Sequence, residues 1–235
     1  MKDKILVALD VETRDEALRL ADTLRGSVGG FKIGSRLFTS EGPAMVRTLT
    51  ERGDRVFLDL KFHDIPNTVA TAVSAATALG VWMVNVHAGG GVAMMQAARA
   101  AAHEAAAKHN VAAPLVIAVT VLTSMNQATL RDTGVVIDLI DQVLRLAELT
   151  KEAGLDGVVA SPRETAAIRR RCGADFAIVT PGIRGGAAAA TKDDQERTMS
   201  PAEAIAAGAS YLVIGRPILS APDPRAAALK IAGAE

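Results

Sequence analysis

The chain has 235 residues, in which 26 lysine and arginine side chains are balanced by 26 aspartate and glutamate side chains. This balance argues against a general nucleic-acid-binding protein, whose phosphate contacts need a basic excess. Hydrophobic residues make up 49% of the chain and charged residues 22%, which excludes a disordered chain. The single cysteine, Cys172, excludes an internal disulfide framework and a cysteine-based zinc site, and is typical of a reducing compartment.

The first apolar run is too short to direct secretion or to cross a membrane. It covers residues 5–9 and ends at Asp10. A signal peptide needs about 7–15 apolar residues, and a membrane span needs about 20. We therefore expect a cytoplasmic protein without a membrane partner.

Short apolar runs alternate along the chain with longer amphipathic or alanine-rich stretches. The runs are rich in Val, Ile and Leu and lack a clean apolar–polar alternation. This pattern is typical of parallel strands that are buried on both faces. We expect strands at residues 5–9, 31–33, 56–60, 83–86, 115–121, 157–160, 176–179 and 211–214.

The stretches between these runs predict helices. Apolar residues recur at helical spacing in several of them. Pro162 and Pro201 favour helix starts, because proline is well tolerated in the first helical turn. Helices are expected at residues 15–24, 69–79, 92–108, 137–153, 162–171 and 201–207.

This order of elements predicts an α/β fold, a (β/α)8 or TIM barrel that forms a single catalytic domain over residues 1–235. Eight units in this length take about 29 residues each, close to one βα repeat of a barrel of ~250 residues. An open doubly wound sheet is the alternative. Its glycine-rich loop after the first strand is missing, because Leu9 is followed by Asp10, Val11 and Glu12.

Charged residues gather at the predicted C-terminal ends of the strands, where such barrels carry their chemistry. Residues i and i+2 of a strand point the same way, so Asp59 and Lys61 project together into the barrel mouth. Lys32 and Asp10 come from neighbouring strands and face the same mouth, with Asp64 just beyond. A structural ion pair would explain Asp59 and Lys61 alone. Burying charge is costly, so the larger group favours an active site.

Residues 59–68 read D-L-K-F-H-D-I-P-N-T. This stretch resembles the active-site signature of the orotidine 5'-phosphate decarboxylase family, a D-x-K-x-x-D core followed by I-P-x-T. The core alone is shared with related sugar-phosphate enzymes. Other blocks similar to those of the family follow in order along nearly the whole chain: A-L-D at 8–10, F-K-I-G at 31–34, V-N-V-H-A at 84–88, V-L-T-S at 121–124, P-G-I-R at 181–184, D-D-Q at 193–195 and I-G-R-P-I at 214–218.

The resemblance implies an enzyme that removes CO2 from orotidine 5'-monophosphate to give UMP, the last step of de novo pyrimidine synthesis, without a cofactor. It implies that Lys61 stabilises the carbanion and then protonates C6, while Asp59 faces the departing carboxylate. Lys32 and Asp64 complete an alternating charge network with these two residues. Asp10 and Lys32 match the positions that contact the ribose hydroxyls.

The resemblance also implies a homodimer with shared sites. In the family, the second acid of the motif, here Asp64, is contributed across the interface to the partner's site. Ile65 and Thr68 accompany it as substrate-binding residues.

The phosphate of the substrate is expected at the last two strands. Gly215 allows close approach of the backbone, Arg216 offers a bidentate fork to phosphate oxygens, and barrels often bind phosphate there. Residues 182–199 predict a lid over the site. By resemblance, Arg184 lies at the root of that lid, Gln195 bridges base and phosphate, and Thr123 binds the pyrimidine edge.

Two other functions stay open. A magnesium-dependent 3-keto-hexulose-6-phosphate decarboxylase or synthase shares the D-x-K-x-x-D core, but carries an acid near the end of strand 2, where this chain has Lys32. A cation there opposes metal binding, so no metal is expected. A non-catalytic nucleotide- or phosphate-binding barrel has no reason to bury Asp59 opposite a substrate carboxylate. Asn85 is given no role, and His87 is expected to be a hydrogen-bonded structural residue.

Overall fold

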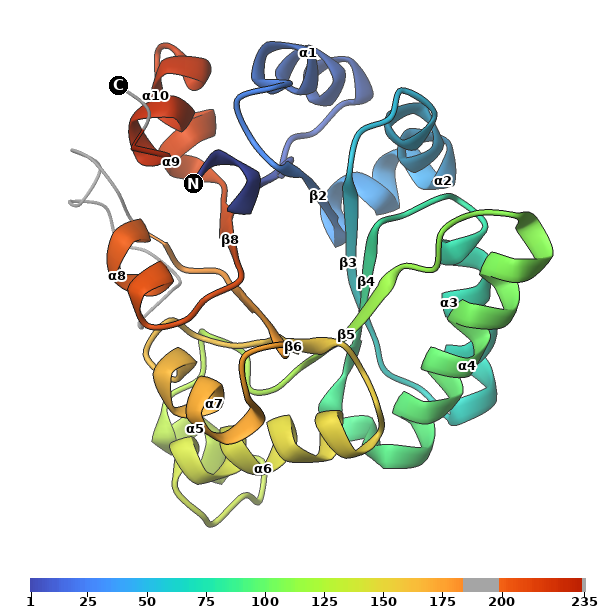
Figure 1. Cartoon of the computed structure of the whole chain (residues 1–235), viewed down its shortest axis with the longest axis vertical. Coiled ribbons are helices and arrows are strands. Elements are labelled where there is room, and N and C mark those ends of the chain that lie inside the picture. The colour runs from blue at the N-terminus through green and yellow to red at the C-terminus, as the bar shows by residue number, and fades with distance from the viewer. Residues whose placement is uncertain (184–198, 234–235) are drawn as a thin grey trace.

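The computed structural model describes residues 1–183 and 199–233 and has a closed barrel at its centre (Figure 1). Within these residues, eight parallel strands pair in chain order, and β1 closes the ring against β8. This confirms the predicted (β/α)8 barrel. The strands are β1 (Ile5–Ala8), β2 (Gly30–Gly34), β3 (Val56–Phe62), β4 (Met83–His87), β5 (Leu115–Val119), β6 (Gly157–Val159), β7 (Ala177–Thr180) and β8 (Tyr211–Ile214).

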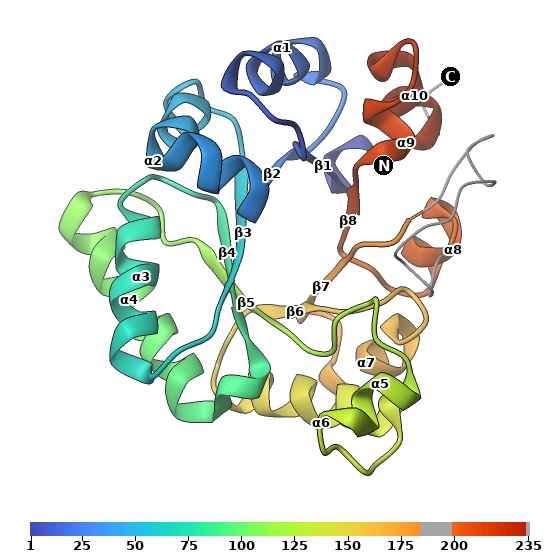
Figure 2. The ribbon, with the colours of Figure 1, turned by 180° about the vertical axis from the view of Figure 1, so that it is seen from behind.

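Helices surround these strands, as the view from behind in Figure 2 also shows. Each longer helix buries one face and exposes the other; α1, for example, buries Ala17, Ala21 and Leu24. Two 3-10 turns, η1 (Lys2–Lys4) and η2 (Ala88–Gly90), precede β1 and α4. The helices are α1 (Arg14–Leu24), α2 (Ser35–Glu51), α3 (Pro66–Thr77), α4 (Gly91–His109), α5 (Gln127–Asp132), α6 (Leu139–Glu152), α7 (Thr165–Cys172), α8 (Pro201–Ala206), α9 (Arg216–Leu219) and α10 (Pro224–Ile231).

The structure adds helices that the sequence pattern does not predict, namely α2, α5, α9 and α10. Helix α2 is kinked at Gly42, whose φ of 65° is not helical, and Pro43 follows inside the helix. Glycine and proline normally end helices, which explains why the sequence pattern does not predict this one. The helix expected from Pro162 begins only at Thr165, because the backbone N–H of Glu164 donates to the Ser161 carbonyl in a turn.

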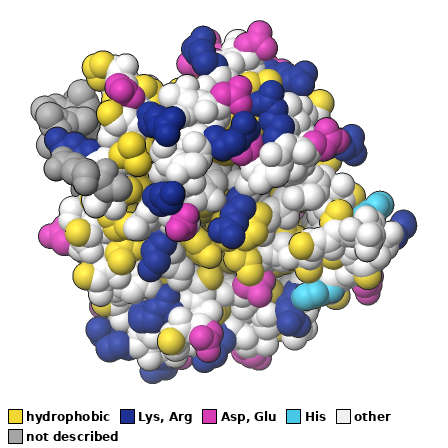
Figure 3. Space-filling model, turned by 45° about the horizontal axis from the view of Figure 1, so that its top comes forward, with side chains coloured by type: hydrophobic (Ala, Val, Ile, Leu, Met, Phe, Trp, Pro, Cys, Tyr) yellow, Lys and Arg dark blue, Asp and Glu magenta, His cyan; other side chains and the backbone are white. Residues whose placement is uncertain are grey.

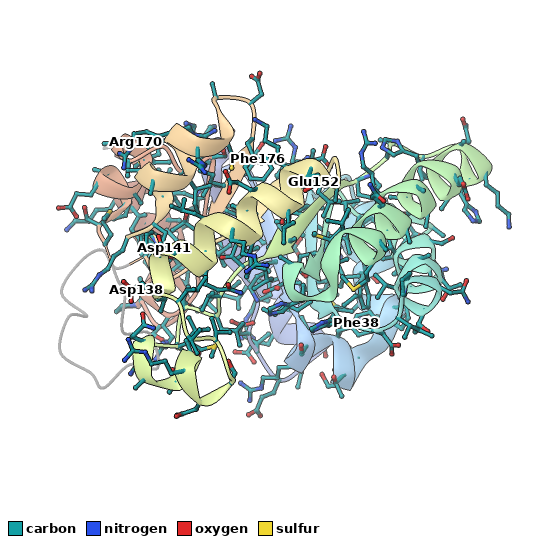
Figure 4. All side chains as sticks on the ribbon, turned by 90° about the horizontal axis from the view of Figure 1, so that it is seen from below. Phe38, Asp138, Asp141, Glu152, Arg170 and Phe176 are labelled. Carbon is teal, nitrogen blue, oxygen red and sulfur yellow. The ribbon has the colours of Figure 1, made fainter. Side chains whose placement is uncertain are left out.

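The helix starts carry groups that satisfy or complement their free N–H groups. Ser200 and Glu203 form a reciprocal capping box at the start of α8. Asp138 and Asp141 lie at one end of α6 and Glu152 at the other (Figure 4). The two aspartates face the positive end of the helix dipole, which favours negative charge.

The inside of the barrel is filled with apolar side chains. Phe57 on β3 and Met83 on β4 are almost fully buried within it, and each lies two residues before a polar residue on the same face of its strand. At the end of the barrel where the strands begin, Trp82 packs edge-on against Tyr211 with ring centroids 5.0 Å apart. Arg55 lies over the Trp82 ring. The barrel is therefore a packed core with an apolar floor.

The face of the molecule that Figure 3 shows is mixed in charge, with hydrophobic side chains between the charged ones. Figure 3 shows lysine and arginine side chains interspersed with aspartate and glutamate over the face in view. Among the described helices, none combines the length and the apolar character that crossing a membrane requires.

Two hollows of about 510 and 650 Å³ lie where the strands begin, and they share Ala174, Ser210 and Tyr211 in their walls. Arg169, in the wall of the smaller one, donates to the carbonyl oxygens of Gly173, Ala174, Phe176 and Gly208. Its guanidinium therefore ties loops together, and the hollows lie away from the charged residues that end the strands.

Candidate active site

Three neighbouring strands place their polar residues at one rim of the barrel. Because the strands are parallel, their C-terminal ends meet there. The pairing sets Lys32 of β2 beside Ala8 of β1, and Gly34 beside Asp59 of β3. This register brings together the side chains that we call the charge cluster: Asp10, Lys32, Asp59 and Lys61.

Asp59 is the centre of the charge cluster. Its Oδ1 atom lies 2.7 Å from Nζ of Lys61, and its Oδ2 atom lies 3.4 Å from Nζ of Lys32. Lys32 also lies 3.3 Å from Oδ1 of Asp10. The Lys32 and Asp59 side chains are 9% and 12% exposed, whereas Asp10 is 53% exposed. The cluster thus runs from a buried centre to an open edge, with acids and bases in alternation.

Burial of Asp59 by itself would raise the pKa of its carboxyl group. The positive charges of Lys32 and Lys61 outweigh this effect, and hydrogen bonds from Lys61 and Asn85 add to them, so the pKa of Asp59 is held below its usual range. Asp59 is therefore a carboxylate at neutral pH. A buried, ionised acid between two ammonium groups, with a shifted pKa, is typical of a functional site.

Lys61 adopts an unusual backbone conformation. Its φ is 53°, in the left-handed region that side chains other than glycine rarely enter. The pairing of β3 with β4 is irregular between Leu58 and Phe62, so Lys61 leaves the regular ladder. Its backbone N–H instead donates to Oδ1 of Asn85 at 2.8 Å.

Asn85 is a site residue to which the sequence reading gives no role. It is completely buried on β4, and its Nδ2 atom donates to Oδ1 of Asp59 at 2.7 Å. An asparagine between two valines of a strand is the signal that could have identified it, because asparagine is depleted in strands.

The segment after β3 lies apart from the charge cluster within one chain. Asp64, Ile65 and Thr68 are all exposed, and Ile65 is 67% exposed. Asp64 accepts a hydrogen bond from the backbone N–H of Ile65 at 2.6 Å. Among the described residues it pairs with none of the lysines or arginines. Thus the structure brings together only three members of the expected network, Lys32, Asp59 and Lys61.

The expected phosphate residues are placed only in part. Gly215 follows β8 beside β1, because a Cβ atom there would lie 3.6 Å from Cβ of Ala8 and 4.0 Å from Oδ2 of Asp10. Arg216 begins α9 and is exposed. Arg184, Gln195 and most of the expected lid fall outside the described residues; Ile183 and Met199, which flank them, form a parallel bridge.

Thr123 is half-buried in the turn that follows β5. Its strand ends at the same rim as the charge cluster, since β5 is parallel to its neighbours. The structure records no hydrogen bond that ties Thr123 to the cluster in the described residues.

The prediction that His87 is a hydrogen-bonded residue is wrong for one of its ring nitrogens. Nδ1 of His87 is buried and has no hydrogen-bond partner among the described residues. The ring instead stacks on that of His63, with centroids 5.1 Å apart and an interplanar angle of 14°. Burial, followed by the nearby charges of His63 and Lys61, holds the pKa of His87 below its usual range. The ring is therefore neutral at physiological pH.

Comparisons with known proteins agree with this geometry. The family described as "Orotidine 5'-phosphate decarboxylase / HUMPS family" matches residues 3–231. The orotidine 5'-phosphate decarboxylase of Moorella thermoacetica is 59% identical over 232 residues, which cover 98% of this chain and 91% of that protein. The enzyme of the same name from Syntrophotalea carbinolica is 54% identical over 230 residues, with coverages of 98% and 93%.

Solved structures show the same barrel. The crystal structure of orotidine 5'-phosphate decarboxylase from Lactobacillus acidophilus matches with a TM-score of 0.85 at 34% identity, covering 98% of this chain and 97% of that one. An uncharacterized conserved protein from Geobacillus kaustophilus matches with a TM-score of 0.84 at 38% identity, covering 98% and 99%.

Proposed function

This chain belongs to the orotidine 5'-phosphate decarboxylase / HUMPS family, and on that premise we propose that it converts orotidine 5'-monophosphate to UMP and CO2 without a cofactor. This is the last step of de novo UMP synthesis. The observation that supports the proposal most directly is the charge cluster, with the Asp59 carboxylate between the ammonium groups of Lys32 and Lys61.

The chemistry needs such a cluster. When the bond between C6 and the carboxylate carbon breaks, the electron pair stays on C6 in the plane of the pyrimidine ring, where neighbouring carbonyl groups cannot delocalise it. Stabilisation must come from charges that are already in place. The Lys61 ammonium faces the developing carbanion and then transfers a proton from Nζ to C6. The Asp59 carboxylate faces the departing carboxylate and holds Lys61 in position.

The same geometry disfavours the magnesium-dependent sugar-phosphate relatives. The family description covers both kinds of enzyme, but the two curated relatives above carry the decarboxylase name. In addition, Nζ of Lys32 lies between Oδ1 of Asp10 and Oδ2 of Asp59, at 3.3 and 3.4 Å. An ammonium group thus fills the space between two carboxylates that a divalent cation would need.

The remaining contacts to the substrate are part of the proposal. Asp10 and Lys32 bind the ribose hydroxyls at the open edge of the charge cluster. The residues that bind the pyrimidine and the phosphate are Thr123, Arg184, Gln195, Gly215 and Arg216.

We further propose that the active enzyme is a homodimer in which Asp64, Ile65 and Thr68 reach the partner's site. The support is that all three side chains are exposed within one chain, including a large apolar one. Mixing Asp64→Ala subunits with Lys61→Ala subunits should restore one intact site per heterodimer. Heterodimers that form without regaining activity would contradict shared sites.

The absorbance of orotidine 5'-monophosphate, followed with purified protein in EDTA, tests the activity. We expect turnover in the wild type and a loss of about 1,000-fold or more in Lys61→Ala, because both charge stabilisation and the proton donor are removed. Lys108→Ala, which changes an exposed lysine of α4, is the matched control and should behave as the wild type. Turnover only after Mg²⁺ is added would favour the sugar-phosphate function. Binding of UMP without turnover would favour a non-catalytic barrel.

The proposal places the enzyme in the cytoplasm. The support is that Cys172 is a buried, free thiol, which is typical of proteins in a reducing compartment.

A further inference from the structure

Asn85 has both ends of its amide committed to the charge cluster. Nδ2 donates to Oδ1 of Asp59 at 2.7 Å, and Oδ1 accepts from the backbone N–H of Lys61 at 2.8 Å. The side chain is completely buried. A buried amide with these two partners fixes two groups relative to each other, the carboxylate of Asp59 and the backbone that carries the Lys61 side chain.

The irregular pairing of β3 explains why an amide is needed at this point. Leu58 pairs with Val84 and Phe62 with Val86, so β3 advances four residues while β4 advances two. The extra residues of β3 cannot all find partners in the ladder. Asn85 lies between Val84 and Val86, and its Oδ1 atom takes the place of the strand carbonyl that Lys61 lacks.

The conformation of Lys61 depends on this contact. The left-handed region is strained for a residue other than glycine, so the surrounding structure must hold Lys61 there. The hydrogen bond from its N–H to Asn85 is the contact that the structure shows at this backbone position. With φ at 53°, the Lys61 side chain turns back so that Nζ reaches Oδ1 of Asp59 at 2.7 Å.

Asn85 also orients the Asp59 carboxylate. Oδ1 of Asp59 accepts from both Asn85 and Lys61, which leaves Oδ2 facing Lys32 at 3.4 Å. Rotation of the carboxylate would break the bond to Asn85. Oδ1 of Asp59 therefore contacts Lys61, and Oδ2 contacts Lys32.

We infer that Asn85 is a positioning residue for decarboxylation, which sets the Lys61 ammonium and the Asp59 carboxylate in their reactive arrangement without touching the substrate. The inference rests on the proposed function, because it assigns Lys61 and Asp59 their roles. It adds an uncharged residue of β4 to a site whose charged groups lie on β2 and β3 or just after β1.

The test compares two near-isosteric substitutions. Asn85→Leu removes both hydrogen bonds, and we expect kcat to fall by about 100-fold with little change in UMP affinity, because misplaced catalytic groups affect the chemical step. Asn85→Asp can replace the amide only while its carboxyl group is protonated, when its O–H donates to Asp59 and its C=O accepts from Lys61. The ratio of wild-type to Asn85→Asp kcat should therefore increase as the pH rises.

Thr150→Val is the matched control for loss of a buried polar group. The Thr150 hydroxyl is fully buried and donates to the Leu146 carbonyl on α6, away from the cluster. Its kcat should match the wild type at every pH. If the ratio for Asn85→Asp does not change with pH, or if Asn85→Leu keeps wild-type kcat, Asn85 has only a structural role and the inference is refuted.

A measurement that needs no turnover separates this inference from the proposed function. Hydrogen exchange at the Lys61 backbone amide, followed by NMR, should be about tenfold faster in Asn85→Leu than in the wild type, since one hydrogen bond is lost. Thr150→Val should leave that exchange rate unchanged. If the Lys61 amide of the wild type exchanges without protection, the inference is refuted, whether or not the protein decarboxylates its substrate. If that amide is protected but the protein shows no turnover, the proposed function is refuted instead.

Discussion

Replacing Asp59 by asparagine removes the negative charge shared by two ammonium groups while keeping the size of the side chain. The effect on Lys32 is the larger one, because the Lys32 side chain is 9% exposed, whereas that of Lys61 is 38% exposed. At 3.4 Å and an effective dielectric constant of about 20, one charge pair contributes about 5 kcal/mol. Lys32 keeps Asp10 at 3.3 Å, but that carboxylate is half in solvent and is screened.

We therefore expect Asp59→Asn to lower the free energy of unfolding by about 3 kcal/mol at pH 7, near the low end for a broken buried pair. Asp10→Asn, which removes the exposed partner of the same lysine, should cost less than about 1 kcal/mol. Urea unfolding curves of the two variants and the wild type give both values. Equal effects of the two substitutions would show that burial does not govern the energetics of the cluster.

The dependence on pH gives a second check on Asp59. Its pKa is lower in the folded protein than the ordinary value of 3.8, so its stabilising effect is fully present above that value. The effect is lost as the pH falls through the folded-state pKa, because the protonated carboxyl no longer attracts Lys32 and Lys61. The difference in stability between the wild type and Asp59→Asn should thus narrow below pH 3.8. A difference that stays constant into the acid range would refute the assignment to charge.

Three further substitutions test other features of the structure. The pKa of His87 is lowered in the folded protein, so the unfolded chain binds the proton more readily and the wild type should lose stability as the pH falls below 6.5. In thermal melts, the melting temperature of His87→Asn should depend less on pH than that of the wild type. Gly34→Ala places a Cβ atom 2.8 Å from Nζ of Lys32, so it should displace that ammonium and lower kcat/KM while the melting temperature changes little. Gly157→Ala places a Cβ atom 2.0 Å from the carbonyl oxygen of Ala177, so it should destabilise the barrel by about 3 kcal/mol in urea unfolding, and a neutral result would contradict the pairing of β6 with β7.

The sequence is sufficient to predict the strands, because each must be buried on both faces and therefore appears as a short apolar run. All eight predicted runs coincide with strands of the described structure, and their ends differ by at most two residues. Helix α2 is not predicted, because Gly42 and Pro43 stand in its middle, and only the tertiary structure shows that the chain resumes its helix after the kink. The proposed extent of the catalytic domain, residues 1–235, stays a prediction.

The charged part of the site is predictable for a similar reason. Lys32, Asp59 and Lys61 lie within strands that should be buried, so their charges stand out from the apolar pattern. The structure places both lysines against Asp59. Asn85 gives a weaker signal, because it has no charge and the bulge that requires it depends on how β3 and β4 pair. The role proposed for Asp64 requires a second chain, since Asp64 is exposed within one chain.

The apolar floor of the barrel limits where the product CO2 can leave the site. In the described barrel, Phe57 and Met83 pack beneath Asp59 and Asn85, so we do not expect newly formed CO2 to leave along the barrel axis in that direction. In the proposed reaction, we expect CO2 to leave at the rim that carries the charge cluster, where the nucleotide also binds. CO2 and UMP are therefore expected to leave by the same route.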